Sequence, residues 1–182
     1  DNLKILADEK TKIVIENHYL GAVFNKSQFD TFYHEHPRTY SYRSFEFIAE
    51  SLGMNVLDAE FVSRYGGNIR VYIGVGDKKV PDIDESQFPA AFDKMNKEIV
   101  KWKSETKIMI DNLVRKNGPI RAKAFPGRAA ILIKLLGLTG DQISAVYEIK
   151  GSIKVGHYVP GTKIPILPEA LLYTKEDLNK PI

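Results

Sequence analysis

The sequence contains no cysteine among its 182 residues. This absence excludes disulfides, thiol nucleophiles and cysteine-ligated zinc within this chain, and it fits a reducing cytoplasm. No apolar run reaches the roughly 18 residues that a membrane-spanning helix needs, and the first residues lack the pattern of a secretory signal. We therefore expect a cytoplasmic protein with no membrane partner.

Blocks of a single charge are missing as well. Lys and Arg number 26 against 23 Asp and Glu, which gives a formal net charge of +3, and both signs are spread along the chain. Without a basic cluster we expect no nucleic-acid partner. Hydrophobic residues make up 43% and charged residues 27% of the chain, which predicts a globular protein with a sizeable core.

The first half of the chain alternates between helix and strand patterns, which predicts an α/β fold. The expected elements are a buried strand at 12–16, a loop with short helical pieces at 27–40, a helix from Ser41 to Leu52, and strands at 54–63 and 69–73 joined by Gly66 and Gly67. This order suits the closing part of an α/β sheet that has an antiparallel strand at its edge.

A polar linker over 74–86 leads to a long helix, for which Ser86 is the predicted cap. Its apolar side chains recur every three or four positions and predict a packing seam. The members of the seam are Phe92, Met95, Ile99, Trp102, Thr106, Met109 and Leu113. A strand at 120–125, a helix at 128–136 and a strand at 143–149 follow, and this order predicts a second unit with parallel strands.

The most informative short segment is Tyr33-His34-Glu35-His36. A histidine beside a carboxylate can act as a general base, because the carboxylate fixes its tautomer and stabilises its charged form. Two histidines two residues apart also suggest metal ligands, although a metal site needs further ligands. A purely structural or surface role is the third interpretation, and the segment alone does not decide between the three.

Glycine patterns offer two further candidates. Gly74-Val75-Gly76 does not fit a dinucleotide fingerprint, because Lys79 occupies the third glycine position and no helix follows promptly. The strand-to-helix turn at 124–129 contains Arg128 and could hold an anion at the start of a helix. A simple tight connection explains this turn equally well.

Four stretches of the chain, in this order and spacing, resemble a known family. They are Glu16–Leu20, Phe29–His36, Gly66–Val71, and Lys154–Thr162 with its continuation to Ile166. The chain is similar over nearly its whole length to the C-terminal half of S-adenosylmethionine-dependent C-methyltransferases that act on nucleotide-linked deoxysugars. The chain departs from the family at Tyr65, where members often have histidine, and at Ala122 and Ala124, where members have more glycine.

The resemblance implies a fold and a place for the cofactors. Residues 1–80 would be the back half of a Rossmann-like, S-adenosylmethionine-dependent methyltransferase domain. Residues 84–182 would be a second Rossmann-like α/β domain, the C-terminal C-methyltransferase domain, which stops early. S-adenosylmethionine and a zinc module would be held by sequence upstream, so no metal site and no assigned cofactor-binding residue are expected here. By itself the chain should neither bind S-adenosylmethionine with useful affinity nor transfer methyl groups.

The resemblance also implies roles for particular residues. Methylation of a carbon beside a ketone needs a base, for which His36 with Glu35 is the candidate, while Tyr33 is a candidate donor to the enolate oxygen. The candidate substrate-binding residues are His18, Tyr19, Asn68, Lys154, His157 and Tyr158. Arg70 fits an ordinary sheet position better than a catalytic one. The alternatives are a nucleotide-sugar-binding module without chemistry and a non-catalytic assembly domain.

Overall fold

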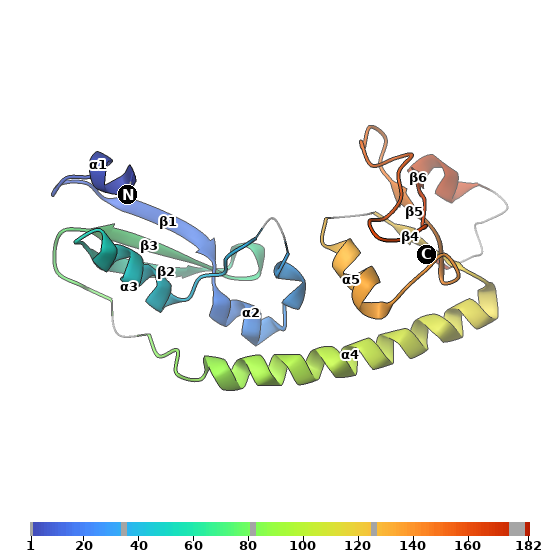
Figure 1. The fold of residues 1–182 in the computed structure, drawn as a ribbon, viewed down its shortest axis with the longest axis horizontal. Coiled ribbons are helices and arrows are strands. Elements are labelled where there is room, and N and C mark those ends of the chain that lie inside the picture. Colours follow the sequence, from blue (N-terminus) through green and yellow to red (C-terminus); the bar gives the residue numbers. More distant parts are fainter. Residues whose placement is uncertain (1, 34–35, 81–82, 125–126, 175–180) are drawn as a thin grey trace. The chain divides into compact units, whose positions relative to one another are not determined.

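The computed structural model describes residues 2–33, 36–80, 83–124, 127–174 and 181–182. The chain forms two compact units, which comprise residues 1–98 and 99–182. Each unit contains a small three-stranded sheet with helices beside it (Figure 1). The α/β class predicted from the sequence is therefore confirmed.

The sheet of unit 1 consists of β1 (Ile13–His18), β2 (Asn55–Val62) and β3 (Asn68–Gly74). Their order is β1-β3-β2, and β3 pairs antiparallel with both neighbours. The prediction that the antiparallel strand lies at the edge was therefore wrong for this sheet. The reason is burial, since alternate side chains of β3, at Ile69 and Val71, are 0% exposed and a strand so covered belongs in the middle.

Helix α3 (Tyr42–Ser51) covers one face of this sheet (Figure 1). Ser41 is its N-cap, as predicted: the Ser41 hydroxyl accepts the Ser44 backbone N–H at 3.2 Å. The Ser44 hydroxyl in turn accepts the Ser41 backbone N–H at 3.2 Å, which completes a reciprocal capping arrangement. Phe45 and Ala49 are each 1% exposed and pack in the same core as the sheet, so the predicted apolar stripe is confirmed.

Helix α2 (Leu20–Lys26) is an element that the sequence patterns do not predict. It has only two turns and carries Gly21 and β-branched Val23, both poor helix formers, and both are buried. Tertiary packing therefore overrides propensity here. The short 3₁₀ turn η1 (Phe29–Thr31) follows and matches the expected helical piece within the loop. A short helix, α1 (Asn2–Leu6), precedes β1.

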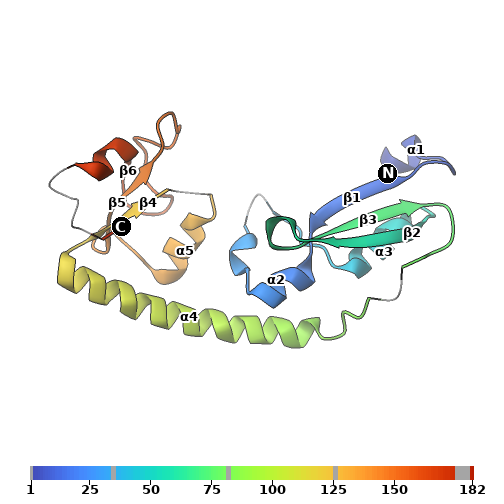
Figure 2. The ribbon, with the colours of Figure 1, turned by 180° about the vertical axis from the view of Figure 1, so that it is seen from behind.

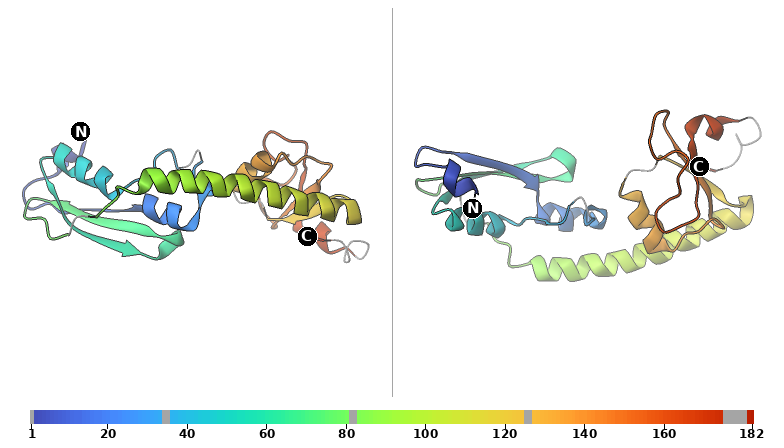
Figure 3. Two further views of the ribbon diagram at one scale, coloured as in Figure 1. Left: turned by 90° about the horizontal axis from the view of Figure 1, so that it is seen from below. Right: turned by 45° about the horizontal axis from the view of Figure 1, so that its top comes forward.

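Helix α4 (Phe88–Asn117) has 30 residues and is continuous (Figure 3), which makes it about 45 Å long at 1.5 Å per residue. Its predicted seam is correct at Met95, which is 2% exposed, but not at Met109, which is 55% exposed. Ile110, 8% exposed, takes that place. An α-helix drifts by about 20° per heptad relative to a 3.5-residue repeat, and this drift turns the next residue toward the core.

The sheet of unit 2 consists of β4 (Ile120–Lys123), β5 (Ile143–Glu148) and β6 (Ile166–Pro168) (Figure 2). The order is β4-β5-β6 and both pairs are parallel, which confirms the predicted pairing. Helix α5 (Ala129–Leu136) connects β4 to β5, and a 3₁₀ turn, η3 (Glu169–Tyr173), follows β6.

The core of unit 2 forms between α5, the sheet and the second half of α4. Ile133 and Leu136 of α5 belong to the same buried cluster as Val146 of β5, Ile164 and the α4 residue Ile110. Among the described residues, no helix is both long and apolar enough to cross a membrane.

The shifted seam of α4 predicts how two neighbouring positions respond to truncation. Ile110→Ala removes buried methylene groups and should lower the free energy of unfolding by about 2–5 kcal/mol. Met109→Ala, the matched control, removes an exposed side chain and should change it by no more than about 0.5 kcal/mol. Urea unfolding followed by circular dichroism measures both values, and equal losses at the two positions would contradict the assigned face.

Candidate active site

An apolar pocket of about 540 Å³ lies in unit 1, between α2, the segment after η1 and the first part of α4. We call it the histidine pocket. Its lining residues are Leu20, Phe24, Phe32, Tyr33, His36, Pro37, Thr39 and Phe92. Two of the three candidate catalytic residues therefore line one pocket.

Tyr33 and His36 face each other in the histidine pocket. Their rings stack with centroids 5.0 Å apart and planes inclined by 23°. The His36 backbone N–H donates to the Tyr33 carbonyl at 2.8 Å, which closes a tight turn. His34 and Glu35 lie outside the described residues. The imidazole of His36 is exposed, so it can reach a ligand while Tyr33 presents a phenolic hydroxyl beside it.

His18 ends β1 and contacts the segment that leads to Tyr33. Its Nδ1 lies 3.1 Å from the hydroxyl oxygen of Thr31, a residue that is 3% exposed. His18 is not among the residues that line the histidine pocket. The contact fastens the end of β1 to η1, two residues before Tyr33.

Tyr19 lies at the junction of β1 and α2 and donates its hydroxyl to the Glu85 carboxylate at 3.0 Å. Burial raises the pKa of Tyr19 above its usual value near 10, and the negative charge of Glu85 raises it further. The phenol is therefore neutral and a hydrogen-bond donor at neutral pH. Its ring packs against Phe61 and Phe88, with centroids 5.0 and 6.1 Å away.

A second pocket of about 480 Å³, which we call the glycine pocket, contains two of the candidate substrate-binding residues. Its lining residues are Tyr19, Ala22, Asn25, Lys26, Phe61, Val62, Ser63, Gly66, Gly67 and Asn68. None of these lines the histidine pocket. The structure therefore brings Tyr19 and Asn68 together, but in a pocket separate from that of Tyr33 and His36.

The paired glycines allow the β2–β3 turn to approach α2 (Figure 2). A Cβ at Gly67 would lie 2.5 Å from the Ala22 Cβ, and the φ of +139° disfavours any other residue. The Tyr19 backbone N–H donates to the Gly67 carbonyl at 3.1 Å, which holds the approach. Close packing against α2 accounts for this glycine.

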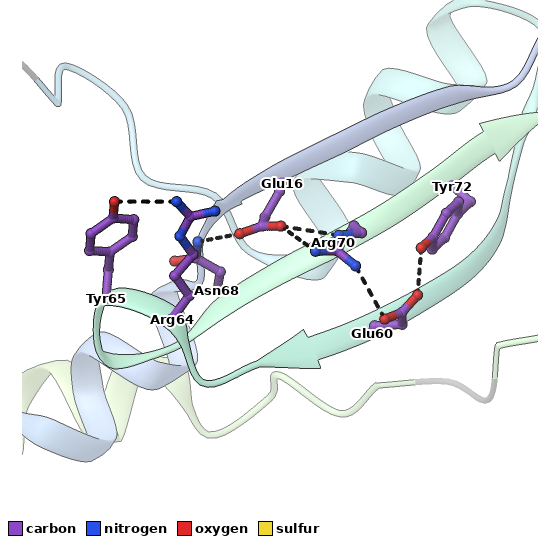
Figure 4. A network of polar contacts seen from close by, with 7 residues as sticks. All are labelled: Glu16, Glu60, Arg64, Tyr65, Asn68, Arg70 and Tyr72. Atoms are coloured by element: carbon purple, nitrogen blue, oxygen red, sulfur yellow. Dashed lines mark hydrogen bonds and ion pairs between the residues drawn. The ribbon is translucent and has the colours of Figure 1, made fainter.

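Asn68 belongs to a polar network on β1, β3 and β2 (Figure 4). Its amide donates to one oxygen of Glu16 at 2.9 Å, and Arg70 donates to the other at 2.7 and 3.0 Å. The bonds from Asn68, and then those from Arg70, lower the pKa of Glu16. Arg70 also lies 3.5 Å from Glu60. Its guanidinium is thus bound between two carboxylates of the sheet.

The remaining candidates, Lys154, His157 and Tyr158, share one loop of unit 2 between β5 and β6. Backbone bonds anchor it: the Ile166 N–H donates to the His157 carbonyl at 2.8 Å. His157 is exposed, Tyr158 is 62% exposed, and the ammonium of Lys154 lies 4.0 Å from Glu148. The loop therefore presents these side chains from a fixed backbone.

The turn before α5 was the other candidate, as an anion site. Phe125 and Pro126 lie outside the described residues. Ala124, just before them, has a φ of +62°, and Arg128 is the N-cap residue of α5 without a capping side-chain bond. The anion hypothesis stays a prediction.

Sequence patterns do not assign two residues, Glu85 and Phe92, to the site. Glu85 stands in a polar linker where no pattern distinguishes it from Asp84. Phe92 has the spacing of a packing residue, yet it is 47% exposed and lines the histidine pocket. No sequence signal marks either residue, because each depends on contacts between segments far apart in the chain.

Comparison with known proteins shows to which family the chain is related. The model of the C-methyltransferase C-terminal domain matches residues 64–178. The chain belongs to this family. The chain also resembles C-methyltransferase NovU of Streptomyces niveus, with 26% identity over 164 residues. That alignment covers 84% of the chain and 39% of the relative, so the chain spans about two fifths of the relative's length.

These matches confirm the resemblance inferred from the sequence. The family match includes Asn68 and the Lys154–Tyr158 loop, whereas His18, Tyr33 and His36 precede it. The family match thus spans the β2–β3 turn, β3, α4 and most of unit 2.

The raised pKa of Tyr19 predicts a pH dependence of stability. In the unfolded chain a tyrosine loses its proton near pH 10, whereas folded Tyr19 keeps it to higher pH. This contribution is complete below pH 10 and is lost as the pH rises further. Above pH 10 the free energy of unfolding should fall more steeply for the native chain than for Tyr19→Phe.

The limiting slope for one proton is about 1.4 kcal/mol per pH unit, and partial exposure of the ring makes the difference smaller. Urea unfolding at several pH values between 8 and 11.5, chosen to span the ordinary tyrosine pKa of about 10, measures it. Parallel curves for the native chain and Tyr19→Phe would show that Tyr19 titrates normally.

Proposed function

We propose that this chain is the acceptor-handling part of an S-adenosylmethionine-dependent C-methyltransferase that acts on a nucleotide-linked keto-deoxysugar or a similar ketone. Within it, residues 1–80 would form the back half of a Rossmann-like methyltransferase domain and residues 84–182 the C-terminal C-methyltransferase domain. The observation that carries the proposal is the stacked Tyr33–His36 pair in an apolar pocket of a C-methyltransferase family member.

The described residues do not supply a site for S-adenosylmethionine. Such a site in an α/β fold needs a glycine-rich loop between a strand and a helix. Gly74 and Gly76 follow β3, but the next helix begins only at Phe88. We therefore assign the main cofactor-binding segment to upstream sequence, where the family also places its zinc module. This chain's own residues account for the proton chemistry of the acceptor.

His36 would remove the proton from the carbon beside the ketone. The carbon–hydrogen bond breaks, its electron pair becomes the enolate, and the proton goes to the imidazole nitrogen. Glu35 would stabilise the resulting imidazolium. Phe24, Phe32 and Phe92 line the pocket with apolar rings.

Tyr33 would donate its hydroxyl to the enolate oxygen as negative charge develops there. His18, whose Nδ1 lies 3.1 Å from the Thr31 hydroxyl oxygen, is the second candidate for the sugar or enolate oxygens. Tyr19 and Asn68 would contact the substrate through the glycine pocket. Lys154, His157 and Tyr158 of unit 2 are the remaining candidates for substrate binding.

The fixed loop of unit 2 favours one alternative, a nucleotide-sugar-binding module without chemistry. Its exposed His157 and Tyr158 rest on a hydrogen-bonded backbone, which suits recognition. A cytoplasmic location remains part of the proposal.

The role of His36 predicts a loss of turnover in the natural full-length enzyme. His36→Ala should lower kcat by roughly a hundredfold or more, the scale for a lost general base. The dissociation constant of the acceptor should change far less. Single-turnover and steady-state kinetics with saturating acceptor and S-adenosylmethionine measure these two effects separately.

His157→Ala is the matched control, since it removes another exposed imidazole. It should raise the acceptor KM and leave kcat nearly unchanged. Near-normal turnover of His36→Ala at saturating substrate would refute the assignment. Acceptor binding with no turnover in the native enzyme would favour the binding module.

A further inference from the structure

The segment that carries Tyr33 and His36 leaves and returns to the sheet at the same place. We call residues 20–33 and 36–40 the site loop; they include α2, η1 and the two catalytic candidates that the structure describes, Tyr33 and His36. The Leu20 backbone N–H donates to the Tyr40 carbonyl at 2.9 Å, and Tyr19 and Tyr40 form an isolated β-bridge. The two ends of the site loop therefore lie side by side and are hydrogen-bonded to each other.

The Glu85 carboxylate contacts the residues that flank both ends. One oxygen accepts the Tyr19 hydroxyl at 3.0 Å and the Tyr42 backbone N–H at 2.7 Å, and the other accepts the Arg43 N–H at 3.2 Å. Glu85 is only 6% exposed. A carboxylate so buried needs hydrogen bonds to all its oxygens, and the positive start of α3 suits its charge.

Capping of α3 alone does not require this arrangement. The side chain of Ser41 already accepts the Ser44 N–H. Glu85 accepts the backbone N–H groups of Tyr42 and Arg43. The bond to Tyr19 adds nothing to the helix. It connects the strand end before the site loop to the helix start after it.

The same residue lies three positions before α4. Phe88 of α4 packs on the Tyr19 and Phe24 rings, with the Phe24 centroid 5.2 Å away, and Phe92 lines the histidine pocket. Glu85 thus lies next to the start of the helix that forms one wall of the pocket, and its carboxylate contacts residues beside the ends of the loop that forms the other.

We propose that Glu85 is a positioning residue that holds the site loop, and so the Tyr33–His36 pair, in its reactive arrangement by joining Tyr19 to the start of α3. The inference rests on the proposed function of His36. Glu85 does not line the histidine pocket, and it acts through Tyr19 and the backbone of Tyr42 and Arg43.

The test uses Glu85→Gln in the natural full-length enzyme. Gln keeps the size of the side chain but loses the negative charge. Its NH₂ group would replace one of the two oxygens that now accept hydrogen bonds. We expect kcat to fall by roughly ten- to a hundredfold, since a misplacement of about 1 Å can cost that much, with the KM for S-adenosylmethionine little changed. The His36 imidazole signal in spectra of ¹³C-histidine-labelled enzyme should also shift.

Two further variants separate positioning from stability. Tyr19→Phe cuts the same connection without touching α3 and should shift the His36 signal too, which keeps the test available if Glu85→Gln folds poorly. Ser41→Ala weakens the cap of α3 but keeps the Tyr19–Glu85 bond. It should lower the melting temperature while leaving both kcat and the His36 signal unchanged.

The outcomes are distinguishable. An unchanged His36 signal and unchanged kcat in both Glu85→Gln and Tyr19→Phe would overturn the inference, and so would equal effects in Ser41→Ala. A shifted His36 signal with full turnover would uphold the positioning role of Glu85 and contradict the role of His36 as the base.

Discussion

The buried carboxylate of Glu85 needs hydrogen-bond donors for both oxygens, and these donors come from the segments of unit 1 that surround the candidate active site. Glu85 accepts one hydrogen bond from a phenol and two from the start of a helix. Closing a loop of about twenty residues costs on the order of 3 kcal/mol of chain entropy, and these bonds act where its two ends meet. The α2 wall of the histidine pocket and the Tyr33–His36 turn lie within that loop, and in our proposal their arrangement depends on this closure.

Local signals in the sequence were enough for the elements whose cause is local. The Ser41 cap, the stripe through Phe45 and Ala49, and the turn at Gly66 and Gly67 follow from side-chain chemistry within a few residues. Parallel pairing in unit 2 follows from the strand–helix–strand order. The Tyr33–His36 contact was also within reach, because the two residues are close in the chain.

Non-local causes account for what the sequence did not reveal. Helix α2 has weak helix formers and is held by burial of Gly21 and Val23. The central position of β3 depends on its pairing with β1, which lies far away in the chain. The role of Glu85 depends on partners more than 40 residues away. The candidate residues Tyr19 and Asn68 line a pocket of their own. Helix α2, which was not predicted, lies between the two pockets: Leu20 and Phe24 line the histidine pocket, whereas Ala22 and Lys26 line the glycine pocket.

The central claim is that His36 takes a proton from the carbon beside the acceptor's ketone. Exchange of that proton with solvent deuterium, followed by mass spectrometry of the acceptor in the full-length enzyme without methyl transfer, tests it most directly. The account predicts deuterium uptake at that carbon with the native enzyme and little or none with His36→Ala. Undiminished uptake with His36→Ala would contradict it.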